Sequence, residues 1–179
     1  SPRSAEPRSA ELAPATRDAV ESAARSITEH VAPAFEALLD HDSVEVRSAS
    51  VAVLGLLPND AAARRAVLRA LDDPTPAVQN AALAALGRSS HDEAGRELTR
   101  ILLEGGDWRL RRGAARALDQ WLQGAPSERP AAEALAALRR AAAGDAMTVV
   151  RQAARATLEH QETRPSAARL DPAESSPVE

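Results

Sequence analysis

Apolar and small residues recur along this chain with the spacing of one helix face. The segment that begins at residue 46 reads Val-Arg-Ser-Ala-Ser-Val-Ala-Val-Leu-Gly, and its positions i, i+3, i+4, i+7 and i+8 are Val46, Ala49, Ser50, Val53 and Leu54. The 3.6-residue period of an α-helix places these positions on one side, which predicts that they are buried. Strong helix formers dominate the chain and aromatic residues make up only 2% of it, so the pattern predicts an all-α protein.

The same pattern occurs four times. It begins at Val46, Val78, Leu110 and Val150, so it recurs after 32, 32 and 40 residues. The longest spacing contains residues 124–130, whose Gly and Pro content predicts a surface loop. Each copy follows another apolar helical segment, at about 31–39, 61–71, 93–103 and 131–143. The sequence therefore predicts four helix pairs, over residues 31–57, 60–88, 92–123 and 130–161.

The ends of the chain differ from the middle. Residues 1–14 and 162–179 are rich in Pro and in small or charged residues and lack an apolar helical stripe. We expect a disordered arm and a disordered tail there. Residues 15–161 are then one domain, in which residues 17–27 could form an N-terminal capping helix.

The repeated segments resemble the HEAT-repeat family, in particular its short bacterial form and the HEAT-like repeats associated with bilin lyases. The resemblance is carried by an Asp-Pro turn followed by Val-Arg-x-Ala-Ala-x-x-Ala-Leu-Gly, as in residues 71–87, where Gln79 replaces the usual arginine. It implies an α-α superhelix, or α-solenoid, in which second helices line a concave surface. Helices of about 12 residues are marginal alone, so stacking of the pairs is physically required. The resemblance indicates the architecture better than the function.

One polar column should stabilise the solenoid. Arg47, Gln79, Arg111 and Arg151 occupy equivalent places in the four copies. The resemblance implies that they form a ladder with aspartates of the turns, for which Asp42, Asp107 and Asp145 are available, whereas Pro74 interrupts that column in the second copy. Direct contact of the column with a ligand is the alternative interpretation.

A neighbouring column suggests a binding surface. It contains Ser48, Asn80, Arg112 and Gln152, and the third copy departs most from the others. Arg109, Arg112 and Arg116 are spaced i, i+3 and i+7, so they share a stripe that Arg151 and Arg155 could extend into the fourth copy. The stripe predicts docking of an acidic peptide or a phosphate. The alternative is a solvated face balanced by Glu104, Asp107 and Asp119.

The two tryptophans receive different interpretations. Trp121 continues the buried series of its helix, so we expect it in the core. Trp108 stands at the helix-opening turn, where it either covers the turn or stacks on a ligand. The candidate partner-binding residues are therefore Asn80, Trp108, Arg109, Arg112, Arg116 and Arg155.

Charge and composition narrow the function classes. The net charge is −4 and the pI about 5.6, which argues against a surface devoted to nucleic acid. All 22 basic residues are arginine, so an arginine at any one position is weaker evidence of a functional role. The chain has no cysteine, and its sequence shows no nucleotide-binding loop, zinc-ligand spacing or catalytic triad order. No segment approaches the roughly 20 apolar residues that span a bilayer.

Three enzyme classes contain related repeats and are alternatives to a binding protein. HEAT-like DNA glycosylases use aromatic, acidic and arginine side chains, which Trp108, Asp107 and Arg112 superficially match. Di-iron hydroxylases bring His-Glu pairs together, whereas this chain has His-Asp pairs at 41–42 and 91–92, which do not superpose between copies. A bilin lyase would need a tetrapyrrole site, of which the sequence has no mark.

The sequence therefore predicts a non-enzymatic scaffold or adaptor that binds a protein or peptide, acidic in character, through the concave surface. We expect no cofactor, no metal and no membrane insertion, and the composition disfavours a nucleic-acid partner. The alternative is a nucleic-acid-associated protein such as a relative of the alkylpurine DNA glycosylases. A cytoplasmic location is expected, while a periplasmic location, membership of a larger complex and origin from a longer chain stay open.

Overall fold

The computed structural model describes residues 30–57, 60–124 and 127–163, and every regular element within them is a helix. The predicted arm, the predicted capping helix and the tail beyond Thr163 lie outside the described residues. Residues 30–37 are helical and lead into η1 (Leu38–Asp40). The further elements are α2 (Val44–Leu54), α3 (Ala61–Arg69), η2 (Ala70–Asp72), α4 (Pro76–Gly87), α5 (Asp92–Glu104), α6 (Trp108–Gln123), α7 (Glu128–Gly144) and α8 (Thr148–Thr163). The prediction of an all-α solenoid is confirmed.

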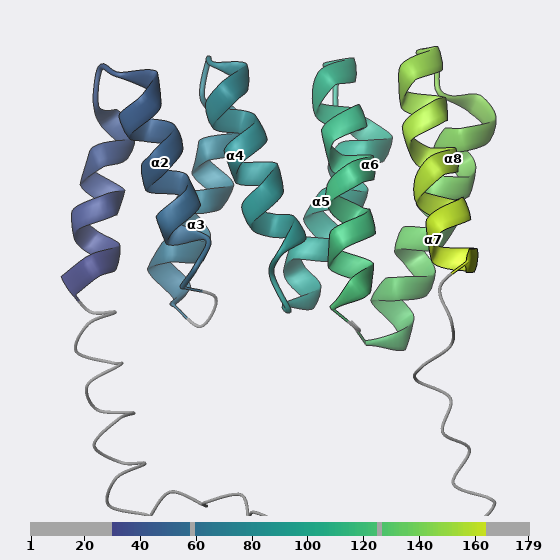
Figure 1. Cartoon of the computed structure of the whole chain (residues 1–179), viewed down its shortest axis with the longest axis horizontal. Helices are drawn as coiled ribbons and strands as arrows, with labels where there is room; N and C mark the ends of the chain where they lie inside the picture. The colour runs from purple at the N-terminus through teal and green to yellow at the C-terminus, as the bar shows by residue number, and fades with distance from the viewer. Residues whose placement is uncertain (1–29, 58–59, 125–126, 164–179) are drawn as a thin grey trace, which may run out of the picture.

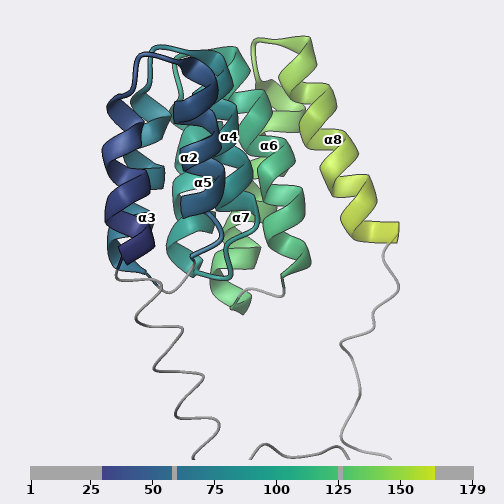
Figure 2. The ribbon, with the colours of Figure 1, turned by 60° about the vertical axis from the view of Figure 1, so that its left-hand side comes forward.

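The helices form two layers. The second helices α2, α4, α6 and α8 follow one another side by side in one layer, and α3, α5 and α7 lie behind them (Figures 1 and 2). The turns that join the two helices of each pair all lie at the same end of the molecule, the upper end in Figure 1. Equivalent residues of successive repeats therefore become neighbours in space, which is what allows a ladder or a stripe to form.

The helices begin where the sequence supplies caps. Ser43 accepts a hydrogen bond from the Val46 N–H at 3.3 Å, and Asp60 accepts one from the Ala63 N–H at 2.7 Å. Proline occupies the first position of α4, where its missing N–H is tolerated. In the predicted loop over 124–130, α7 already begins at Glu128, because Pro130 falls in the first turn and breaks no helical hydrogen bond there.

The buried face of the second helices differs from the prediction in one column. Ala49 at position i+3 is exposed, whereas the i+5 residues Val51, Leu83 and Ala115 are buried. A Cβ added to Gly113, at i+3, would meet Leu83 of the preceding repeat, so the i+3 residue of each second helix faces the repeat before it. Since no described second helix precedes α2, Ala49 stays uncovered.

Close approach of neighbouring second helices depends on glycine. A Cβ added to Gly55 would lie 2.5 Å from the Cβ of Ala85, and one added to Gly87 would lie 2.9 Å from the carbonyl oxygen of Ala117. Real Cβ atoms do not come that close, so the i+9 position in the first two copies must lack a side chain. The third copy has Asp119 at this position.

Trp121 lies in the core, as predicted. It is 1% exposed, and its indole Nε1–H donates to the backbone carbonyl of His91 at 3.1 Å. The ring fills the space above Gly95 of α5, which has no side chain to obstruct it. Trp121 therefore joins the two helices of the third pair.

Candidate functional site

Two arginines form a ladder between adjacent repeats. Arg47 donates from Nε and Nη2 to the carboxylate of Asp73 in the next repeat, at 2.8 and 3.3 Å, and from Nη1 to the carbonyls of His41 and Asp42. Arg111 repeats this pattern with Asp145 at 2.8 and 3.1 Å and with the carbonyls of Gly105 and Gly106. Each guanidinium thus ties its own turn to the turn of the following repeat.

The ladder aspartates also hold the turns that lead into the helices after them. Asp73 accepts the Thr75 N–H and Asp145 accepts the Met147 N–H, both at 2.8 Å. The hydrogen bonds from Arg47 and Arg111 lower the pKa of Asp73 and of Asp145, against the opposing effect of burial. The side chains of Arg47, Asp73, Arg111 and Asp145 therefore have a structural role in joining the repeats.

The sequence prediction named one correct ladder acid, Asp145, but two wrong ones, and it missed Asp73. Asp42 contributes only its backbone carbonyl, and Asp107 caps α6 by accepting the Arg109 N–H at 2.8 Å. The acid position lies six residues before the ladder column, where the four copies carry His41, Asp73, Gly105 and Asp145. Asp145 lies six residues before Arg151, and the same spacing from Gln79 would have identified Asp73. The sequence prediction missed Asp73 because it placed the neighbouring Pro74 in the acid column. Gln79 accordingly has no acid opposite it, since Gly105 occupies that place.

The arginine stripe lies along α6. Arg109 is exposed, its guanidinium carbon is 4.8 Å from the centre of the Trp108 ring, and its Nη1 is 3.7 Å from Asp107. Trp108 is half-buried against the core, with Arg109 covering its ring. Arg112 is half-buried and Arg116 exposed, and neither has a hydrogen bond or ion pair to another described residue.

Two hollows flank the stripe. One, of about 320 Å³, lies between α4 and α6 and includes Asn80 and Trp108; the other, of about 510 Å³, lies between α6 and α8. Arg112 and Arg116 line both hollows. The two arginines therefore form a ridge between two depressions, and the structure brings Asn80, Trp108 and Arg109 to its side.

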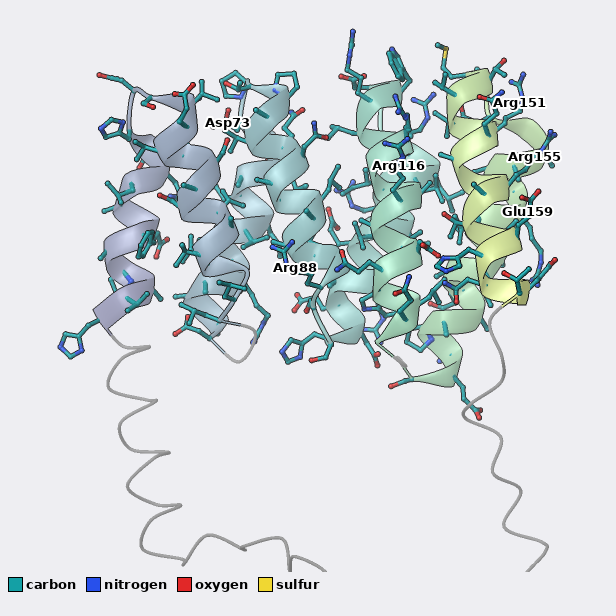
Figure 3. All side chains as sticks on the ribbon, viewed as in Figure 1. Asp73, Arg88, Arg116, Arg151, Arg155 and Glu159 are labelled. Atoms are coloured by element: carbon teal, nitrogen blue, oxygen red, sulfur yellow. The ribbon has the colours of Figure 1, made fainter. Side chains whose placement is uncertain are left out.

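Arg155 does not join this ridge. The α8 residues that line the larger hollow are Val149, Gln152, Ala153, Ala156, Thr157 and His160. The helical period places Arg151 and Arg155 on the other side of α8, and Figure 3 shows both along its outer edge. The predicted extension of the stripe through these residues is wrong, because i+4 spacing keeps Arg151 and Arg155 together but not on the face that meets α6.

The floor of the larger hollow contains a polar cluster that the sequence prediction missed. Asp119 accepts from Gln161 Nε2 at 2.8 Å, and its carboxylate lies 2.8 Å from Nδ1 of His160. Asp119 was expected to balance the arginine stripe, but it pairs with α8 instead. Asp119 occupies the i+9 position, which is glycine in the first two copies. In those copies the neighbouring second helices touch at the glycine, whereas in the third copy the side chain of Asp119 lies between α6 and α8. Comparing that column between copies was the available signal.

The described residues also bear on metal binding and on membrane insertion. Among them, no three His, Asp or Glu side chains are grouped so that they could hold a metal ion. His41 opens the turn before α2 and His91 precedes α5, and those two connections lie at opposite ends of the layers (Figure 1). Within the same ranges, no helix has the length and apolarity needed to cross a membrane.

Comparisons with known proteins agree with this geometry. A family model described as HEAT repeats matches residues 31–119. Among solved structures, human deoxyhypusine hydroxylase in complex with glycerol is similar with a TM-score of 0.58 and 24% sequence identity, over 75% of this chain and 44% of that chain. This chain thus spans less than half of that protein's length, and at this identity the likeness shows the fold alone. No curated protein sequence matches the chain.

Proposed function

The chain belongs to the HEAT-repeat family, and on that premise we propose that it is a non-enzymatic scaffold or adaptor that binds an acidic segment of a partner protein. The binding surface is the face of the second-helix layer around α6. The observation that carries this proposal is the ridge of Arg112 and Arg116, which have no acidic partner among the described residues and stand between two hollows.

The contrast with the ladder supports this assignment. Arg47 and Arg111 each bind a carboxylate and two carbonyls, so they have little hydrogen-bonding capacity left for a partner. The guanidinium groups of Arg112 and Arg116 each keep their N–H donors available, and two donors of one guanidinium can bind both oxygens of a carboxylate. A partner carboxylate would satisfy donors that solvent alone now satisfies, while its neighbouring side chains enter the hollows.

The surroundings of the ridge favour a peptide over nucleic acid. Asp107 and Asp119 stand near its two ends, and the chain as a whole carries a net charge of −4. A nucleic-acid surface relies on a broad positive field, and one that binds single strands also offers free aromatic faces for base stacking. Here Arg109 already covers the ring of Trp108. The hydroxylase of similar fold is an enzyme, but the likeness reaches only the fold, so the proposed role is binding without catalysis.

Charge reversal tests the proposal. The triple variant Arg109→Glu, Arg112→Glu, Arg116→Glu is compared with a matched control, Arg65→Glu, Arg96→Glu, Arg139→Glu, whose exposed arginines lie on α3, α5 and α7. Both variants change the charge equally. Using a fluorescent hexaglutamate peptide as probe, we expect the ridge variant to bind at least about tenfold more weakly than the control, because exposed ion pairs contribute up to about 1 kcal/mol each.

Equal affinity of the two variants would refute the assignment of the ridge. Binding of a 20-base-pair DNA duplex by the unmodified chain, falling steeply between 50 and 200 mM salt and lost in the ridge variant, would favour the nucleic-acid alternative. Circular dichroism of both variants checks that their helicity is unchanged. Affinity capture from the native host, with the same variant pair, would then identify the partner.

A further inference from the structure

At α8 the arginine ladder presents a guanidinium, that of Arg151, with no carboxylate opposite it among the described residues. Arg151 donates from Nη1 to the carbonyls of Asp145 and Ala146, at 2.6 and 3.2 Å. Arg47 and Arg111 make the same two bonds to the carbonyls six and five residues before them. The guanidinium of Arg151 is therefore held by its own turn as in the two complete ladder steps.

The other edge of this guanidinium is where the three arginines differ. In Arg47 and Arg111, Nε and Nη2 bind the two oxygens of one carboxylate. In Arg151, Nη2 donates to Thr148 Oγ1 at 2.7 Å, and Nε has no acceptor among the described residues. Since the side chain is already oriented, binding a carboxylate there requires little further ordering of the protein.

We propose that the outer edge of α8 is a second docking surface, where Arg151 receives an aspartate from the turn before a helix in a partner protein. The chain itself shows the fit twice, because Asp73 and Asp145 bind an arginine while accepting the N–H two residues later. The recognised feature is therefore an aspartate in the turn that precedes a helix. This surface lies on the opposite side of α8 from the ridge, so the inference does not depend on the proposed function.

The remainder of the edge determines which kind of helix can pack on it. Arg155 and Glu159 follow Arg151 at i+4 and i+8 along the outer side of α8 (Figure 3). The positions equivalent to Arg155 are Val51, Leu83 and Ala115, which are buried beneath the next repeat. An apolar helix face would desolvate Arg155 without pairing it, so the partner must present acidic groups near its turn and a basic group lower down.

A second copy stacked head to tail does not satisfy this requirement. The acid position of the first described turn holds His41, whose Nδ1 accepts the Ser43 N–H at 3.0 Å, as Asp73 accepts the Thr75 N–H. A neutral imidazole that accepts at Nδ1 carries its proton on Nε2, a tautomer inferred from this hydrogen bond. In a head-to-tail stack, the Nε2–H of His41 and the guanidinium of Arg151 would both be donors, so no hydrogen bond could form between them. Among the described residues, α8 thus has an open ladder position, and the turn that contains His41 has no acid at the matching place.

Nuclear magnetic resonance of the arginine Nε–H groups in the full chain tests the inference. The probe is the peptide acetyl-Asp-Pro-Thr-Pro-amide, which copies residues 73–76. The control is the same peptide with asparagine in place of the aspartate. We expect the Nε–H groups of Arg47 and Arg111 to be protected from exchange and that of Arg151 to be unprotected. The Asp peptide should shift the Arg151 signal saturably at millimolar concentration, and the Asn analogue should bind at least about tenfold more weakly.

The variant Arg151→Lys keeps the charge but loses the planar pair of donors, so it should lose the response to the Asp peptide without a change in helicity. Equal shifts with both peptides, or shifts of Arg112 and Arg116 without Arg151, would overturn the inference, and the latter would leave the proposed function standing. Protection of Arg151 without peptide would also overturn it. Loss of that protection on removing residues 164–179 would identify the occupant as the chain's own end, and loss on dilution would identify a second copy.

Discussion

Replacing Gly95 by alanine should destabilise the protein, although alanine is the better helix former. Gly95 lies inside α5, where the exchange alone would stabilise the helix by about 1 kcal/mol. A Cβ at this position would come within 3.0 Å of three ring atoms of Trp121, which real Cβ atoms do not do. The ring must therefore move, and the sign of the effect depends on how easily it can.

The structure indicates that the ring cannot move freely. Trp121 is 1% exposed, and its Nε1–H is bonded to the His91 carbonyl, so a shift would strain the core and weaken a buried hydrogen bond. Overpacking a core costs about 1–3 kcal/mol, and a weakened buried hydrogen bond adds about 1 kcal/mol. After the gain in helix propensity, we expect a net loss of about 1–3 kcal/mol, with the melting temperature falling roughly 2–4 °C for each kcal/mol.

Thermal and urea unfolding followed by circular dichroism measure this loss. Gly144→Ala in α7 is the matched control, because a Cβ there meets nothing within 4 Å, so it should be neutral or stabilising. In a Trp121→Leu background, Gly95→Ala should lose most of its destabilising effect, since the ring is gone. If Gly95→Ala melts at or above the unmodified protein, as the control does, the packing of α5 against Trp121 is not as described.

Two further predictions concern the ladder and the ends of the chain. Because Asp73 and Asp145 have lowered pKa values in the folded protein, their stabilising effect is complete above their unfolded pKa of about 4 and is lost as the pH falls through the folded values. Asp73→Asn and Asp145→Asn should therefore destabilise the protein at pH 7, with a smaller difference in urea unfolding at pH 3; a difference independent of pH would contradict this. Removing residues 164–179 should hardly change the melting temperature, whereas removing residues 128–179 uncovers Ala115 and takes Asp145 from Arg111, so it should lower it clearly. Equal losses from both truncations would refute this division of the chain.

The local architecture could be predicted because it depends on neighbouring positions in the sequence. The period of apolar residues specified the helices, and the Asp, Pro and Gly turns marked where they begin and end. The recurrence of one phrase showed that equivalent faces must stack on one another. Trp121 could be assigned to the core for the same reason, since its place in the period is that of Leu110, Ala114 and Leu118.

The candidate site was only partly accessible from the sequence. The i, i+3 and i+7 spacing placed Arg109, Arg112 and Arg116 along one helix, but it could not show that two hollows flank them. It also could not show that Arg155 faces away from them, because that depends on which side of α8 packs against α6. The pairing of Asp119 with His160 was hidden for the same reason.

The sequence by itself determined the helix pairs, their turns and their order, because a helical period and a cap involve residues only a few positions apart. Tertiary structure alone decided that Arg47 reaches Asp73 and Arg111 reaches Asp145, whereas Nε of Arg151 has no acceptor in the part of the chain that the structure describes. Those relations depend on the displacement between successive repeats. Contacts such as those at Gly55 and Gly87 set that displacement, and they form only when the repeats pack together.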